Sequence, residues 1–371
     1  MRYYIVAGEA SGDLHASNLM KAIKKLDNQA DFRCWGGHKM EAQGCTLVKH
    51  YKDLAFMGFW QVITNIRTIV KNLRFCQDDI SGYKPDALIL IDYPGFNLRI
   101  AKFARKHNIK VYYYISPQVW AWKKSRVHLI KKTVDKMLVI LPFEKDFYAQ
   151  FDYEVDFVGH PLLDAIAEEQ EQTKSTNHSE DKPTVAILPG SRKQEIEKML
   201  PVMLKVTARF PEYRFVVCAV SSVGSSIYDA NIKNKDVQIV YDQTYDVLAE
   251  AYAALVTSGT ATLETALFKV PQVVCYKADP FSYIIAKKLI KLKYISLVNL
   301  IMDQKVLTEL IQKDFNEARL CNSLKKITQD KQSRQDVLDA YEALSRILGG
   351  TGASSKAASI IYQNALSTKT D

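Results

Sequence analysis

The stretch TVAILPGSRKQEIEKML, residues 184–200, joins a short apolar run to a tight turn and then to a pattern typical of a helix. Apolar runs of this kind, rich in β-branched residues, form the strands of parallel sheets that helices cover on both faces. The same succession recurs on both sides of this stretch. Earlier runs lie at 3–7, 87–92, 111–116 and 136–141, and later ones at 215–220, 237–241, 253–259 and 272–276. The sequence therefore predicts an α/β protein with Rossmann-like, doubly wound sheets.

A polar segment divides the two series of strands. Residues 168–182, EEQEQTKSTNHSEDK, have no apolar face to bury, which is typical of a linker. The chain has 371 residues, enough for two domains. We expect a first domain at 1–167, a linker at 168–182 and a second domain at 183–350. Ligands would collect in a cleft between two such halves, at the carboxyl ends of their strands.

The sequence argues against a membrane-spanning, secreted or metal-binding protein. The net charge is +9, which suits an anionic partner such as nucleic acid, acidic lipid or a phosphorylated substrate. No run approaches the roughly 20 apolar residues that cross a membrane, and the first residues lack the apolar core of a secretory signal. The six cysteines include no C-x-x-C pair and are expected to be free thiols in a reducing cytosol. The histidines have no metal-ligand spacing, so no metal is expected.

Two turns of the second half suit a nucleotide diphosphate. Gly190, Ser191 and Arg192 follow a strand and open a helix, which brings backbone N–H groups and a guanidinium to one place. The turn TSGTATLE, 257–264, offers small residues at another helix start, and Glu264 is placed to accept ribose hydroxyls. Each turn alone also fits an ordinary helix cap. A P-loop, a G-x-G-x-x-G after a strand and a D-x-D triplet are absent, so we assign the leaving-group charge to Arg192 and helix dipoles.

The first half offers groups for an acceptor. GEASGDLH, residues 8–15, follows the first strand and places acidic and hydroxyl groups between two glycines. Asp92 ends a strand and precedes the turn YPGFN, which would present its carboxylate, although an aspartate there is often only a cap. His160 is expected to be structural. The block SPQVWAW, 116–122, suits aromatic packing either at a cleft edge or in the core.

Two segments are candidates for contact with lipid. FMGFW, 56–60, leads into a helical pattern with an apolar side and basic residues elsewhere, as in an interfacial helix. A helix packed on the core gives a similar pattern. FSYIIAKKLIKLK, 281–293, also separates apolar residues from lysines. No nucleic-acid-binding module accompanies these charges, so we do not expect nucleic acid as a partner. The residues expected to contact membrane or acyl chains are Phe56, Met57, Phe59, Trp60, Ile63 and Ile66.

Eight motifs, in one order over nearly the whole chain, resemble those of the lipid-A-disaccharide synthase family. They are GEASGD (8–13), IDYPGFN (91–97), SPQVWAW (116–122), LPFE (141–144), GH (159–160), LPGSR (188–192), SGTATLE (258–264) and NL (299–300). The resemblance implies a GT-B fold, with two Rossmann-like domains facing a cleft and a C-terminal helix within 351–371 that crosses back to the first domain. It also implies a cytoplasmic enzyme, peripherally associated with the inner membrane.

The resemblance further implies an inverting hexosyltransferase of lipid A (lipopolysaccharide) biosynthesis. Such an enzyme joins UDP-2,3-diacylglucosamine to 2,3-diacylglucosamine 1-phosphate and releases the disaccharide 1-phosphate and UDP, with no metal or other cofactor. Matched by motif, Asp92 is the base for the acceptor 6-hydroxyl, with Glu9, Ser11, Asp13 and His15 on the acceptor side. The nucleotide-side residues are Gly190, Ser191, Arg192, Ser258, Gly259, Thr260, Glu264 and Asn299.

The chain departs from the family pattern at two places, and other functions stay open. Residues 303–305, DQK, stand where the family has Gly-Arg-Glu, and Lys277 and Asp279 stand where it has Arg and Lys. These departures bear on the nucleotide-side contacts. The alternatives are another UDP-sugar enzyme of this fold, either a murein-type N-acetylglucosaminyltransferase or an epimerase, and a non-catalytic lipid or nucleotide-sugar binding protein. The segment 56–75 and the block SPQVWAW, 116–122, disfavour an epimerase of soluble substrates. The oligomeric state stays open.

Overall fold

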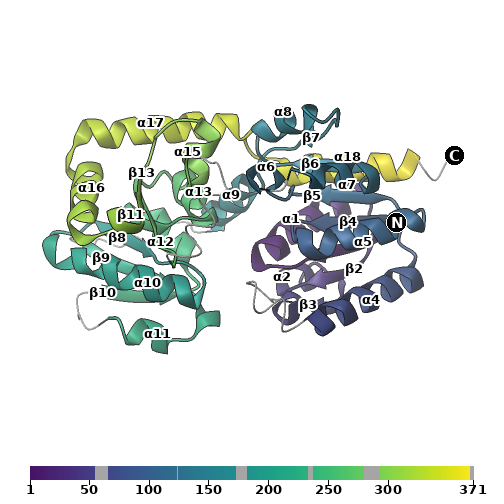
Figure 1. Ribbon diagram of the computed structural model, residues 1–371, viewed down its shortest axis with the longest axis horizontal. Helices are drawn as coiled ribbons and strands as arrows, with labels where there is room; N and C mark the ends of the chain where they lie inside the picture. The colour runs from purple at the N-terminus through teal and green to yellow at the C-terminus, as the bar shows by residue number, and fades with distance from the viewer. Residues whose placement is uncertain (55–65, 123, 173–181, 233–236, 280–292, 368–371) are drawn as a thin grey trace. The chain divides into compact units, whose positions relative to one another are not determined.

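The computed structural model describes residues 1–54, 66–122, 124–172, 182–232, 237–279 and 293–367. The chain divides into two compact units (Figure 1). Unit 1 consists of Met1–Ala165 and Leu348–Asp371, and unit 2 of Ile166–Ile347. Helix α9, Leu162–Gln172, begins in unit 1 and continues into the segment predicted to be a linker. The rest of that segment, 173–181, lies outside the described residues.

Unit 1 is built on a seven-stranded parallel sheet of order β3-β2-β1-β4-β5-β6-β7. Every residue of β4 is buried, because helices cover the sheet on both faces. The strands are β1 Arg2–Ala7, β2 Asp31–Gly36, β3 Thr46–His50, β4 Ala87–Ile91, β5 Val111–Tyr114, β6 Lys136–Val139 and β7 Asp156–Phe157. The helices of unit 1 are α1 Ala10–Leu26, α2 His38–Glu41, α4 Ile66–Tyr83, α5 Pro94–Lys106, α6 Val119–Trp122, α7 Arg126–Thr133, α8 Phe143–Ala149 and α18 Ala353–Ser367.

Unit 2 repeats this plan with a six-stranded parallel sheet of order β10-β9-β8-β11-β12-β13. Its strands are β8 Thr184–Leu188, β9 Arg214–Ala219, β10 Val237–Tyr241, β11 Ala251–Thr257, β12 Gln272–Tyr276 and β13 Thr308–Ile311. The helices are α10 Lys193–Met203, α11 Ser226–Asp229, α12 Thr244–Glu250, α13 Thr260–Leu267, α15 Leu297–Met302, α16 Glu317–Gln329 and α17 Lys331–Ile347. In both units the order of strands reverses beside the first strand, as it does in doubly wound sheets. The fold class predicted from the sequence is confirmed.

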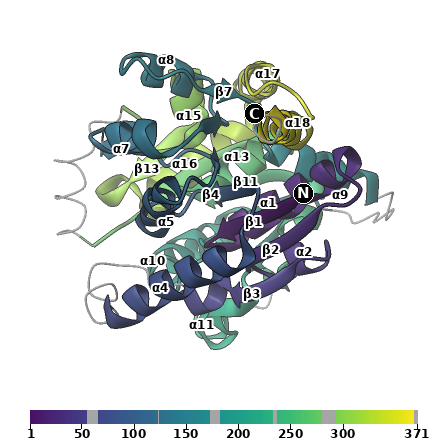
Figure 2. The same cartoon turned by 90° about the vertical axis from the view of Figure 1, so that its right-hand side faces the viewer.

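The helices of unit 1 form two layers. Helices α4 and α5 lie side by side over one face of the sheet (Figure 2), and their core includes Tyr113 of β5. Successive strand residues point to opposite faces. Tyr112 accordingly points the other way and donates a hydrogen bond to Asn364 of α18, 3.0 Å away. Helix α18 packs on α1, so the last helix returns to the unit of the first, as the family resemblance implied.

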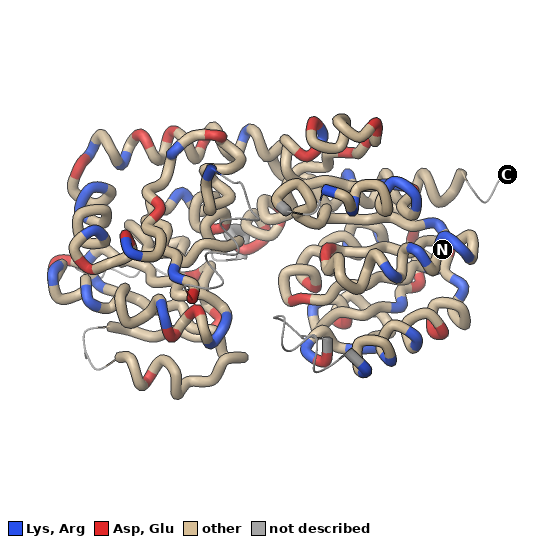
Figure 3. The backbone as a smooth tube through the Cα atoms, in the orientation of Figure 1, with Lys and Arg blue, Asp and Glu red and all other residues tan. Residues whose placement is uncertain are grey.

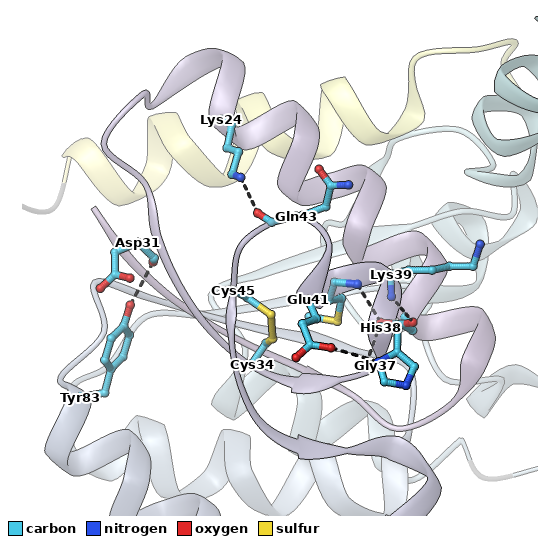
Figure 4. Close-up of a disulfide and its surroundings, with 12 residues drawn as sticks. Lys24, Asp31, Cys34, Gly37, His38, Lys39, Glu41, Gln43, Cys45 and Tyr83 are labelled. Carbon is cyan, nitrogen blue, oxygen red and sulfur yellow. Dashed lines mark hydrogen bonds and ion pairs between the residues drawn. A yellow bond between two sulfur atoms is a disulfide. The ribbon is translucent and has the colours of Figure 1, made fainter.

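The cysteines depart from expectation at one pair. Cys34 of β2 and Cys45, just before β3, form a disulfide with an S–S distance of 2.04 Å (Figure 4). The prediction of six free thiols is therefore wrong for these two residues. The other four cysteines are free, and Cys76, Cys218 and Cys275 are buried. Spacing could not identify the bonded pair, because it depends on the parallel pairing of β2 with β3.

Candidate functional site

A strained turn carries the proposed base at the carboxyl end of β4. Asp92 and Tyr93 have φ angles of 43° and 48°, so two successive non-glycine residues adopt the left-handed conformation. This conformation is unfavourable for residues with a Cβ and persists only where the surroundings hold it. Helix α5 begins at the next residue, Pro94, whose fixed φ suits a first helical position. The motif IDYPGFN therefore forms a strand, a strained turn and a helix start.

The loop after β1 lies against this turn. Strands β1 and β4 pair in parallel with Ala7 opposite Ile91, so Gly8 and Glu9 follow β1 beside the residues that follow β4. A Cβ on Gly8 would come within 2.3 Å of the Tyr93 ring. Only glycine admits the ring there without a shift of the ring or the backbone. The two motifs GEASGD and IDYPGFN thus meet at the carboxyl ends of the central strands β1 and β4.

Burial changes the acid strength of Asp92. Removal from water, followed by the negative charge of Glu9, raises the pKa of the Asp92 carboxyl from its ordinary 3.8 to about 7. A carboxylate with a pKa close to neutral is a stronger proton acceptor than an ordinary aspartate and still ionises at physiological pH. These are the properties that a general base for a sugar hydroxyl requires.

The four residues predicted for the acceptor side differ in exposure and in their partners. Glu9 is partly exposed and Ser11 is exposed at the start of α1. Asp13 is buried, and its carboxylate accepts hydrogen bonds from the backbone N–H groups of Gly37, Lys39 and Met40 at 2.8–3.1 Å. It therefore holds the loop from β2 into α2. His15 is also buried; burial lowers its pKa to about 4, and its Nδ1 has no hydrogen-bond partner within the described part of the chain.

A second buried carboxylate lies in the LPFE motif of unit 1. Glu144 is 1% exposed and accepts hydrogen bonds from the N–H groups of Ile140 and Leu141. Burial raises its pKa to about 7. Nearby, Ser116 of the SPQVWAW block shares a 2.8 Å hydrogen bond with the hydroxyl of Tyr148. The Trp120 ring packs edge-on against Phe143, so this aromatic block contributes to the core.

The first phosphate-type turn of unit 2 is organised by an acidic residue that the sequence motifs did not single out. Gly190 has a φ of 111°, and Arg192 is the N-cap of α10. Glu195, at the third helical position, contacts the backbone N–H of Ser191 at 3.4 Å and binds the Arg192 guanidinium at 2.9 Å. The spacing of Glu195 after the N-cap, typical of a capping box, is the signal that could have identified it. The Arg192 side chain is 59% exposed, so a ligand can reach it.

The second turn of unit 2 opens helix α13. Gly259 is its N-cap in an extended conformation, and within the described part of the chain no heavy atom other than those of its chain neighbours lies within 4 Å of where a Cβ on Gly259 would stand. Thr260 is the first helical residue, and the Ser258 hydroxyl donates to the carbonyl of Ile295 at 3.0 Å. Glu264 accepts a 2.9 Å hydrogen bond from Tyr245 of α12, and burial raises its pKa. The free space at Gly259 and the helix start suit a diphosphate.

Asn299 has a structural task within unit 2. It is fully buried, and its amide nitrogen donates to the carbonyl of Leu307 and to Glu309, both at 3.0 Å. Its amide oxygen accepts from the N–H of Leu307 at 2.8 Å. Glu309 also accepts from the N–H groups of Ile295 and Ser296. Both amide N–H groups and the amide oxygen of Asn299 thus hold α15 against Leu307 and β13, and Glu309 holds the segment before α15.

The residues predicted to contact lipid fall mostly outside the described residues. Phe56, Met57, Phe59, Trp60 and Ile63 lie there, and the side chain of Ile66, at the start of α4, does too. The described part of α4 has Val70 and Phe75 exposed at 42% and 46%. Arg67, Val70, Lys71, Arg74, Phe75 and Asp78 line a surface hollow of about 530 Å³. Basic residues recur along this helix (Figure 3).

Three further predictions concern membranes, metals and the departures from the family pattern. No helix in the described ranges is long and apolar enough to cross a membrane. Within those same ranges, no three His, Cys, Asp or Glu side chains are grouped so that they could hold a metal ion. The departing residues Lys277 and Asp279 are at least partly exposed, and Asp303 is 87% exposed and pairs with Lys293 at 3.4 Å. Residues 280–292, which include most of the second lipid-type segment, are not described.

Comparison with known proteins identifies the family. The lipid-A-disaccharide synthetase family model matches residues 3–361. The lipid-A-disaccharide synthase of Syntrophus aciditrophicus is 40% identical over 364 residues, 95% of each chain. Two solved structures share the fold at low identity. The calicheamicin glycosyltransferase CalG4 has a TM-score of 0.64 and 15% identity, and the match covers 100% of this chain and 99% of that chain. The Neisseria meningitidis UDP-GlcNAc 2-epimerase bound to UDP-GlcNAc has a TM-score of 0.63 and 13% identity, and the match covers 99% of this chain and 100% of that chain. These neighbours agree with a GT-B fold.

The fold matches cannot choose between a transferase and an epimerase, because both kinds of enzyme are found among them. The family match can, since it covers nearly all of this chain at substantial identity. The chain belongs to the lipid-A-disaccharide synthase family.

Proposed function

We propose that the chain transfers 2,3-diacylglucosamine from UDP to the 6-hydroxyl of 2,3-diacylglucosamine 1-phosphate, with inversion. The products are the β-1,6-linked disaccharide 1-phosphate and UDP. The observation that carries the proposal is the family match over residues 3–361. The raised pKa of Asp92 gives it a chemical basis, because an inverting transfer needs one base behind the attacking hydroxyl.

Each reacting group has a proposed partner. The Asp92 carboxylate accepts the proton of the acceptor 6-hydroxyl as its oxygen attacks the anomeric carbon of the donor sugar. The bond from that carbon to the UDP oxygen breaks, and the negative charge of the diphosphate increases. Arg192 and the start of α13, at Gly259 and Thr260, are proposed to stabilise this charge without a metal ion. Glu264 is proposed to accept the ribose hydroxyls.

The test is a reaction of the purified protein with both substrates, with and without EDTA, following UDP release and disaccharide formation. Disaccharide is expected in both conditions. If no disaccharide forms in either condition, the proposed reaction is refuted. If disaccharide formation is lost only with EDTA, the metal-free mechanism alone is refuted. UDP-sugar binding without turnover would favour a binding protein instead.

Two pairs of variants test the assigned residues. Asp92→Asn and Arg192→Ala are expected to lose most turnover and to keep the wild-type melting temperature. Asp86→Asn, just before the amino end of the same strand β4, and Arg209→Ala, an exposed arginine paired with Glu317 in unit 2, are the matched controls. A wild-type rate for either test variant removes that residue from the proposed site.

We also propose that the enzyme contacts the inner membrane peripherally through the outer side of α4. The exposed Val70 and Phe75 suit the apolar layer, and Arg67, Lys71 and Arg74 suit anionic headgroups. The protein should sediment with vesicles that contain phosphatidylglycerol, less with pure phosphatidylcholine, and less at high salt. Val70→Ser with Phe75→Ser should reduce binding, whereas Leu26→Ser, at a residue 42% exposed on α1, should not. Equal binding by both variants would refute this surface.

A further inference from the structure

The Asp92–Tyr93 turn requires something to hold it, because two successive left-handed residues are unfavourable on their own. Pro94 and the start of α5 fix the backbone after the turn, and Gly8 makes room for the Tyr93 ring. Neither feature binds the peptide group of Asp92 itself. Two polar side chains do.

The first is Tyr113 of the neighbouring strand β5. Its hydroxyl donates a 2.5 Å hydrogen bond to the backbone carbonyl of Asp92. Tyr113 is fully buried in the core beneath α5, so its ring position is set by packing on several sides. A hydroxyl fixed in this way specifies where the Asp92 carbonyl lies, and thereby the direction in which the Asp92 side chain leaves the backbone.

The second is Asn97 of α5, which is 0% exposed. Its amide nitrogen lies within hydrogen-bonding distance of three backbone carbonyls, those of Asp92 at 2.9 Å, Ile91 at 3.2 Å and Val6 at 3.4 Å. One side chain therefore ties the ends of both central strands to the first turn of α5. Asn97, the last residue of the motif IDYPGFN, thus donates a hydrogen bond to Asp92, the first residue of the turn.

We propose that Tyr113 and Asn97 are positioning residues, which hold the Asp92–Tyr93 turn in its left-handed conformation and so aim the Asp92 carboxylate at the acceptor hydroxyl. The proposal rests on the proposed function, in which Asp92 is the base. Neither residue touches substrate in this scheme. Both act through the backbone of Asp92, so their loss should reduce the rate of the chemical step more than substrate binding.

The charged and titratable groups around the turn set the expected pH behaviour. Partial burial is the main cause of the raised pKa of Asp92, and a looser turn would let more water reach the carboxyl. The pKa of Asp92 should then fall, and the acid side of the rate profile should move to lower pH. Among the described residues, the titratable or charged groups that act on Asp92 or Tyr113 are Glu9 before α1, Tyr93 in the turn, Arg126 of α7 and Tyr148 of α8.

The test replaces Tyr113→Phe, which removes the hydroxyl and keeps the ring. We expect kcat to fall about tenfold or more with KM for both substrates within about twofold, because a misplaced base slows the chemistry and leaves the binding groups intact. The midpoint of the acid limb should move to lower pH. A titration of the Asp92 carboxyl carbon by NMR should show the same downward shift, and that measurement does not require turnover. Asn97→Ala should give the same pattern.

The matched control is Tyr112→Phe, on the same strand. Tyr112 is as buried as Tyr113 and its hydroxyl is also hydrogen-bonded, but to Asn364 on the opposite face. It should lose a similar amount of thermal stability and keep the wild-type rate and pH profile. An equal loss of kcat in Tyr112→Phe would overturn the proposal. A Tyr113→Phe enzyme with a lowered melting temperature, but with the wild-type kcat and the wild-type acid limb of the pH–rate profile, would overturn it as well.

A double variant separates the positioning role of Tyr113 from the role of Asp92 as the base. If Tyr113 acts through Asp92, adding Tyr113→Phe to Asp92→Asn should cost little further rate, because the group being positioned is gone. An additive loss would overturn the positioning role. Wild-type turnover in Asp92→Asn alone would instead refute the base, and with it the proposed mechanism.

Discussion

The rate of sugar transfer should fall steeply as the pH is lowered through 7. The experiment lowers the pH from 8 to 5, and the group concerned is the Asp92 carboxyl, whose pKa is raised to about 7 by burial and by Glu9. A base with this pKa is about one tenth ionised at pH 6 and about one hundredth ionised at pH 5. Turnover should therefore decrease about 100-fold over this range. An aspartate with its ordinary pKa of 3.8 would leave the rate nearly constant.

The measured quantity is kcat from UDP release with both substrates saturating, so that ionisation of the acceptor phosphate does not act through binding. Bound substrate removes more water from the carboxyl, so the midpoint in kcat should lie at about pH 7 or above. The buried histidines His15 and His160 cannot produce this limb, because burial lowers their pKa values to about 4 and about 3.

Glu144 is a competitor for this limb, because burial raises the pKa of its carboxyl to about 7 as well. Glu144→Gln should keep the acid limb, because its carboxylate serves backbone N–H groups of its own loop. A flat profile between pH 8 and pH 5 would refute the assignment of a raised pKa to the base. Loss of the limb in Glu144→Gln would move the assignment to Glu144.

Three further variants and one control variant probe unit 2. Gly259→Ala should fold normally, because among the described residues no atom beyond its chain neighbours lies within 4 Å of the new Cβ, and the backbone is extended. It should raise KM for the UDP-sugar about tenfold if a diphosphate packs there; an unchanged KM would place the diphosphate elsewhere. Tyr245→Phe removes the 2.9 Å hydrogen bond to Glu264 and should raise the same KM about fivefold, whereas Tyr252→Phe, whose hydroxyl donates to the carbonyl of Thr328, should not. Asn299→Ala should lower the free energy of unfolding by about 1–3 kcal/mol, because it leaves buried partners unsatisfied; a stability loss near zero in urea denaturation would contradict its structural task.

The sequence predicts the sheets and the places where function gathers, because both depend on local patterns. Strands buried on both faces are apolar throughout, as β4 is and β8 nearly is, and the turns that follow them carry the motifs. The start of α13 at Thr260 and the strand end before Asp92 were predictable for the same reason. These features need only a short window of sequence.

The tasks of individual polar residues were not predictable in this way. Asp13 binds backbone N–H groups of the β2–α2 loop, and Asn299 binds Leu307 and Glu309, so each is committed to partners beyond its own motif. A sequence motif gives the residue type at a position, but it does not show whether the side chain binds a ligand or a neighbouring loop. The pairing of Cys34 with Cys45 depends on the register of β2 with β3, which cysteine spacing does not encode.

The basicity of Asp92 arises mainly from burial, and the register of β1 against β4 adds to it. The parallel pairing that sets Ala7 opposite Ile91 brings Glu9 beside Asp92, and the negative charge of Glu9 then opposes ionisation of the partly buried carboxyl. The same register places Val6 within reach of Asn97, which binds the carbonyl of Asp92 as well. One pairing therefore contributes both to the position of the proposed base and to its pKa. A one-residue slip between β1 and β4 would disturb both properties together, which explains why the motifs GEASGD and IDYPGFN, distant in sequence, have to be considered as one site.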